Sequence, residues 1–165
     1  MKINTIRFGE IDIAEEKILT FENGLPGFDE CFRFTIISSE ETDPFLWLQS
    51  IEDPDVALAV INPFRLFPDY SPVVNEVDLE QLGNPSDDDV LALTVAVIPV
   101  KYELMTTNLL SPILINLKTN KAHQVIMENS SYQVREPIFD RVQQLMGTEA
   151  GDATEGGSMD AGSDT

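Results

Sequence analysis

Residue types that support disulfides, catalysis or membrane insertion are scarce in this 165-residue sequence, which has one cysteine and one histidine. Cys31 has no second cysteine to pair with, and a reducing compartment fits this. The N-terminus lacks the apolar run of a secretory signal, and the longest apolar stretch, residues 95–100, is too short to cross a bilayer. We therefore expect a soluble, cytoplasmic protein with no membrane contact, in which Cys31 is a small buried side chain.

The usual signatures of catalysis and metal binding are also missing. The one histidine, His123, lies in a strand-like run, where a half-exposed strand residue is a simpler interpretation than a catalytic base. No serine stands in a Gly-x-Ser-x-Gly elbow, and Asp87-Asp88-Asp89 lacks the alternating ligands of a calcium loop. The sequence thus predicts no catalytic residue, no cofactor and no metal site. A catalytic pair of carboxylates stays open as an alternative, because acidic residues are so numerous.

Charge of one sign dominates the composition, with a net charge of −19. Residues 10–89 carry 20 acidic groups against three basic ones, a net of −17, whereas residues 90–146 have a net charge of +1. A negative surface repels phosphate backbones and attracts basic proteins. We therefore expect no direct nucleic-acid binding. Solubility, or adaptation to a saline cytoplasm, would explain the same acidity, and charge alone does not separate these explanations from a functional one.

Short segments rich in β-branched and aromatic residues recur along the chain, separated by turn residues. They predict strands at 2–8, 11–13, 17–21, 32–38, 45–51, 56–61, 73–77, 90–97, 112–117 and 122–127. Turn residues at 53–55 and 118–121 predict two hairpins. Residues 90–98 are apolar almost throughout, as in a central strand covered on both faces. Helices are predicted at 78–82, ended by Gly83, and at 137–146, with Gly147 just past the end.

This pattern predicts a mainly β protein, a small antiparallel β-barrel or rolled sheet with one or two short helices. We expect residues 1–146 to form a single domain, long enough to bury its own core. Residues 147–165 combine five glycines and five acidic residues with no aromatic side chain. Such a segment buries too little to offset the entropy of ordering, and we expect a disordered acidic tail.

Several short motifs follow one another along the chain. They are Phe21 and Asn23 with Gly24-Leu25-Pro26-Gly27-Phe28 and Phe32, Pro44-Phe45 with Trp47-Leu48-Gln49-Ser50, Asn62-Pro63-Phe64, Pro68-Asp69-Tyr70, Thr107-Asn108-Leu109, Pro112-Ile113 with Ile115-Asn116, Gln124 and Tyr132. In this order they resemble the flagellar assembly factor FliW family, over about residues 1–138. The acidic tail lies outside the pattern.

The resemblance implies a protein-binding regulator rather than an enzyme. FliW-like proteins bind the translational repressor CsrA, which relieves repression of flagellin messenger RNA. They also bind flagellin, so newly made flagellin removes them from CsrA and closes a feedback loop. Two alternatives stay open: an acidic structural or chaperone-like domain that binds only flagellin, and a carboxylate-dependent hydrolase.

Predicted partner-binding residues lie in the middle of the chain. They are Asn62, Tyr70, Leu104, Thr107, Asn108, Leu109 and Leu110. Asn108 and Asn116 flank a Ser-Pro corner, where amide side chains commonly satisfy loose backbone groups. The segment Gly24-Leu25-Pro26-Gly27-Phe28 predicts a tight turn, since proline fixes φ and glycine permits positive φ. It is either a structural corner that presents Phe28 to the core or a partner-binding loop.

Overall fold

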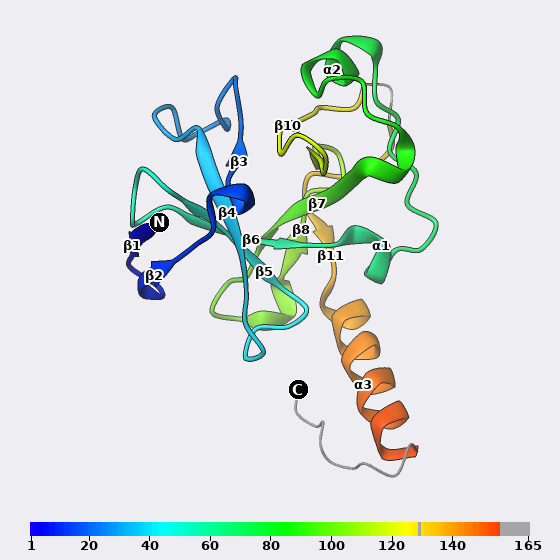
Figure 1. Cartoon of the computed structure of the whole chain (residues 1–165). Coiled ribbons are helices and arrows are strands. Elements are labelled where there is room, and N and C mark those ends of the chain that lie inside the picture. Colours follow the sequence, from blue (N-terminus) through cyan, green and yellow to red (C-terminus); the bar gives the residue numbers. More distant parts are fainter. Residues whose placement is uncertain (129, 156–165) are drawn as a thin grey trace.

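The computed structural model describes residues 1–128 and 130–155 and shows a mainly β protein (Figure 1). The strands are β1 (Lys2–Thr5), β2 (Gly9–Asp12), β3 (Leu19–Thr20), β4 (Arg33–Ser38), β5 (Leu46–Ser50), β6 (Ala57–Ile61), β7 (Val90–Val97), β8 (Thr106–Thr107), β9 (Ile113–Asn116), β10 (Ala122–Gln124) and β11 (Glu136–Pro137). The α-helices are α1 (Pro63–Leu66), α2 (Glu76–Gln81) and α3 (Phe139–Glu155), and short 3₁₀ turns are η1 (Glu15–Lys17), η2 (Asp87–Asp89) and η3 (Tyr102–Leu104).

One antiparallel sheet organises the molecule, with the strand order β10-β9-β7-β6-β5-β4-β3. Strand β8 pairs with β7 and with β11, while β1 and β2 form a separate hairpin. An isolated bridge between Thr20 and Lys121 brings the two outer strands together, with Thr20 N donating to Asn120 O at 2.9 Å. No ladder joins β3 to β10 in the described residues, so the sheet is rolled but does not close into a barrel.

Three clusters of buried side chains make up the core. The largest fills the rolled sheet and includes Phe21, Phe34 and Leu48, all with no exposed surface. A second cluster lies beneath α3, where Ile138 and Val142 are buried. The third lies beneath the segment that contains α2 and is built around Tyr70, Leu82 and Leu109, among others. Cys31 is 5% exposed within the largest cluster, as predicted for a small apolar side chain.

The structure confirms the hairpins and the central strand. Strands β5 and β6 pair across the turn at 53–55, and β9 pairs with β10 across the turn at 118–121. Strand β7 lies between β6 and β9, and Leu93 and Thr94 in it are almost fully buried. The prediction of a strand at 73–77 is wrong. Residues after Pro72 run as a loop into α2, because Asn75 Oδ1 accepts from Asp78 N at 2.8 Å and caps that helix.

The bounds of the C-terminal helix also differ from the prediction. Residue Pro137, predicted at its start, pairs instead with Thr106 in the β11–β8 ladder, so α3 begins at Phe139. The helix continues through Gly147 to Glu155, and therefore includes residues predicted to be disordered. A glycine inside a helix costs only about 1 kcal/mol, which does not by itself end one. The rest of the predicted tail, residues 156–165, lies outside the described residues.

Candidate functional site

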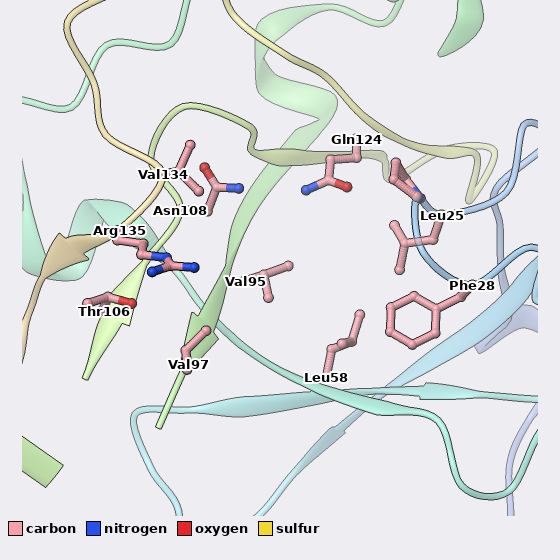
Figure 2. Close-up of a pocket in the computed structure, with 11 residues that line it drawn as sticks. Leu25, Phe28, Leu58, Val95, Val97, Thr106, Asn108, Gln124, Val134 and Arg135 are labelled. Atoms are coloured by element: carbon pink, nitrogen blue, oxygen red, sulfur yellow. The ribbon is translucent and has the colours of Figure 1, made fainter. Parts of the chain in front are cut away.

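A groove opens at the mouth of the rolled sheet, with a volume of about 300 Å³. Its walls combine a turn, the inner face of the sheet and a C-terminal segment (Figure 2). The lining residues are Leu25, Pro26, Phe28, Leu58, Val95, Val97, Thr106, Asn108, Gln124, Val134 and Arg135. The segment 24–28, predicted as a structural turn or a possible partner loop, thus meets the predicted partner-binding segment 104–110, although about 80 residues separate them.

The turn at 24–28 forms one wall of this groove. Gly24 and Gly27 have φ angles of 73° and 90°, and Phe28 N donates to Leu25 O at 2.9 Å. Leu25 is 4% exposed in the core cluster, whereas Phe28 is half-buried and its ring faces the groove. Both interpretations of the turn therefore agree with the geometry. It is a structural corner, and it presents an aromatic ring to the groove.

The segment 106–110 forms the opposite wall and is tied down by its own side chains. Thr107 is 1% exposed, and its hydroxyl donates to Val95 O at 2.9 Å, so it supports β7 from the interior. Asn108 Oδ1 accepts from the backbone N–H groups of Leu110 and Ser111, both at 3.1 Å. The Asn108 side chain holds the corner and lines the groove at the same time.

Other predicted contact residues lie elsewhere. Tyr70 is 4% exposed, and its hydroxyl donates to Leu109 O at 2.7 Å, while Leu109 is 3% exposed. Side chains this buried present almost no area to a partner in this conformation, so both support the core instead. Asn62 Oδ1 accepts from Phe64 N at 3.0 Å and caps α1. Leu104, by contrast, is 61% exposed.

Several exposed apolar side chains follow one another in sequence where β7 leaves the sheet. Val97, Val100 and Tyr102 are 59%, 100% and 63% exposed, and Leu104 follows them. Exposed apolar side chains that gather on a protein surface commonly mark an interaction site. Of these residues, the sequence singled out only Leu104. The sequence offered one signal for this surface, a short apolar run after a predicted strand. Composition does not show whether such side chains are exposed to solvent.

Arg135 is the functional candidate that sequence reasoning missed. Among the described residues that line the groove, it alone carries a charge. The neighbouring backbone is held by the sheet, since Gln133 O accepts from Leu109 N at 3.0 Å and Glu136 pairs with Thr107. The scarcity of basic residues was the available sequence signal for Arg135, because only ten lysines and arginines occur among 165 residues.

The acidic half of the chain is displayed on the surface. All acidic residues between 10 and 89 are exposed except Asp78 and Asp89. Burial opposes ionisation of Glu52, but hydrogen bonds from the Arg33 side chain and backbone outweigh it and lower the pKa of this carboxyl. A hydrogen bond from the Ser86 hydroxyl lowers the pKa of Asp89. These carboxylates therefore stay charged at neutral pH.

The described residues that line the groove include no histidine, cysteine or acidic side chain. His123 Nε2 lies 2.8 Å from Asp78 Oδ1, joining β10 to α2, and neither residue is in the lining. Within residues 1–128 and 130–155, no three acidic, histidine or cysteine side chains are grouped so that they could hold a metal ion. No helix in that part of the chain is long and apolar enough to span a membrane.

The fold and the groove define a small, mainly β protein with a rolled antiparallel sheet and a groove lined largely by apolar side chains. Comparison with known proteins then identifies the family. The model of the FliW protein family matches residues 2–138, so this chain belongs to that family.

Relatives and a solved structure agree with this assignment. A flagellar assembly factor FliW of Caldanaerobacter subterraneus subsp. tengcongensis is 42% identical over 143 residues, which cover 86% of this chain and 95% of the relative. The flagellar assembly factor FliW of Thermotoga neapolitana is 41% identical over 142 residues, with the same coverage. A crystal structure of the flagellar assembly factor FliW superposes with a TM-score of 0.79 at 34% identity, covering 84% of this chain and 97% of that one. The protein therefore has a role in flagellum assembly.

Proposed function

We propose that this protein is a non-enzymatic regulator that acts in the cytoplasm by binding two proteins in turn. One partner is a CsrA-type translational repressor, whose repression of flagellin messenger RNA it relieves. The other is flagellin, which removes it from the repressor and so sets flagellin level by feedback. Family membership supports the link to flagellum assembly, and the observation that carries the proposed mechanism is the acidic surface of residues 10–89.

The acidic surface suggests how the repressor is antagonised. A net charge of −17 in residues 10–89, placed beside a cationic RNA-binding surface, lowers the local electrostatic potential. The effect extends over about one Debye length, ~8 Å at physiological salt. RNA is then repelled without its site being covered. Direct binding of RNA to this protein is not part of the proposal, because its own charge opposes it.

Affinity for either partner requires apolar contact as well as charge. A stable interface buries roughly 1,200–2,000 Å² in total, and a few apolar anchors carry most of its free energy. The exposed side chains of Val97, Val100, Tyr102 and Leu104 are candidates for such anchors. Acidic residues around such anchors mainly raise the association rate and set specificity.

The test is the salt dependence of antagonism. The purified repressor, its RNA site and this protein are mixed at 0.05 M and at 0.5 M salt, about a tenfold range. RNA release is measured by fluorescence anisotropy and complex formation by sedimentation. We expect RNA release to weaken strongly at high salt while the protein complex persists. Equal release at both concentrations, with an intact complex, would refute the electrostatic mechanism.

Partner identity is tested separately by pull-down with both purified proteins. Retention of flagellin but not of the repressor would favour a chaperone-like role. Retention of neither would refute the proposed function.

A further inference from the structure

The charge of the groove is opposite to that of the molecule around it. The chain has a net charge of −19, yet the groove lining contains one arginine and no acidic residue. The 11 described lining residues carry one positive charge and no negative charge, whereas 29 of the 165 residues of the chain are acidic. The one formal charge among the described lining residues is therefore positive, although the net charge of the chain is negative.

Arg135 lies on the wall opposite the aromatic ring of Phe28. Figure 2 shows its guanidinium directed over the groove beside Thr106, while Leu58 and Phe28 face it from the other side. Arg135 is exposed and has no ion-pair partner within the described residues. Since Gln133 and Glu136 are hydrogen-bonded or paired in the sheet, the guanidinium is offered from a fixed stretch of backbone.

A second donor lies on the same wall. The Asn108 amide oxygen is used by the N–H groups of Leu110 and Ser111, so its NH₂ group is left for a ligand. In Figure 2 that nitrogen points into the groove. One wall thus offers hydrogen-bond donors and positive charge, while the other offers aliphatic and aromatic surface.

We propose that the groove binds a protein segment in which an apolar side chain is flanked by an Asp or Glu side chain. The apolar side chain packs among Phe28, Leu58 and Val97, and the carboxylate accepts from Arg135 and Asn108. Arginine presents two parallel N–H donors that match a carboxylate. An acidic side chain suits this site better than a chain terminus, because captured termini use backbone N–H nests whereas these donors are side chains.

This inference rests on the proposed function, of which it specifies one contact. A volume of about 300 Å³ is at the lower end for ligand pockets and accepts an anchor residue rather than a whole interface. The carboxylate requirement favours flagellin as the occupant, because the surface by which the proposed repressor binds RNA is expected to be cationic.

The first experiment compares groove variants with matched controls in the full-length protein, using purified flagellin as the probe. We expect Arg135→Gln to weaken binding about fivefold or more and Val97→Asp about tenfold or more. Val73→Asp and Lys118→Gln change the same chemistry at exposed positions outside the lining, and should stay within about twofold. Thermal unfolding checks that all four variants fold.

The second experiment identifies the carboxylate. A benzophenone side chain in place of Val134 captures the bound flagellin segment, which mass spectrometry locates. Each Asp or Glu near the captured residue is then replaced by its amide. We expect one replacement to weaken binding to the wild-type protein about fivefold and to have little effect on the Arg135→Gln variant.

Three outcomes would overturn the groove assignment: flagellin bound equally well by wild type, Arg135→Gln and Val97→Asp; amide replacements that act equally on wild type and Arg135→Gln; or a captured segment whose carboxylate is the chain terminus. Each leaves the proposed function in place, because flagellin is still retained. If the wild-type protein retains neither flagellin nor the repressor, the proposed function itself fails, and this inference fails with it.

Discussion

Replacement of Tyr70 by Phe tests whether this residue belongs to the core or to a partner interface. The Tyr70 hydroxyl donates to Leu109 O at 2.7 Å, and its ring packs against Tyr132 with centroids 4.8 Å apart. Phe keeps the ring and its contacts but removes the donor, so the Leu109 carbonyl loses its partner in a buried site. An unsatisfied buried group of this kind costs about 1–3 kcal/mol. We expect the free energy of unfolding to fall by about 1.5 kcal/mol.

The same substitution has a pH dependence with a defined sign. Burial, and to a lesser extent the neighbouring Tyr132, raises the pKa of the Tyr70 hydroxyl above its value in the unfolded chain. Ionisation therefore favours the unfolded state. The stability that wild type gains over Tyr70→Phe is fully present below about pH 10, the pKa of an unfolded tyrosine, and shrinks as the pH rises above it.

Urea unfolding followed by tryptophan fluorescence measures both effects, since Trp47 is buried in β5. Tyr102→Phe is the matched control because Tyr102 is 63% exposed, and it should leave stability unchanged within about 0.5 kcal/mol. Partner binding by Tyr70→Phe should equal that of wild type under conditions where both are folded. Unchanged stability combined with weakened partner binding would show that Tyr70 contacts a partner and does not stabilise the core.

Three further substitutions test other features. Leu104→Ala should make the free energy of binding to one partner less favourable by about 2 kcal/mol, as measured by calorimetry. Stability should not change, since the Leu104 side chain is 61% exposed. Binding equal to that of wild type would show that Leu104 is not in the interface. Gly27→Ala should lower the free energy of unfolding, measured in urea, by about 1–2 kcal/mol. The cost comes from the backbone, because φ is 90° at this position while an added Cβ would meet nothing within 4 Å. An unchanged midpoint of urea unfolding would contradict a strained turn. Glu52→Gln should be less stable than wild type at neutral pH, because Arg33 lowers the pKa of the Glu52 carboxyl in the folded protein. The difference in the free energy of unfolding should disappear as the pH falls below 4.5. A difference that stays constant across that range would contradict the ion pair.

Local chemistry in the sequence was sufficient to predict much of the fold. The hairpin turns at 53–55 and 118–121 and the central strand β7 depend on neighbouring residues, whose turn propensities and apolar runs are visible directly. The same holds for the positive φ of Gly27. The ordered motifs from Phe21 to Tyr132 were sufficient to predict the family, because their spacing is specific even though each motif alone is short.

Tertiary contacts decided the rest. The apolar residues of 73–77 suggested a strand, but no neighbouring strand pairs with them in the described residues, and the Asn75 cap starts a helix instead. The sequence predicted Tyr70 as a partner-binding residue. Its hydrogen bond to Leu109, 39 residues away, shows that it lies in the interior instead. The groove likewise forms because the β8–β11 ladder brings residues 134–135 opposite the turn at 24–28. Local propensity sets turns and strands, whereas long-range pairing determines which side chains share a surface.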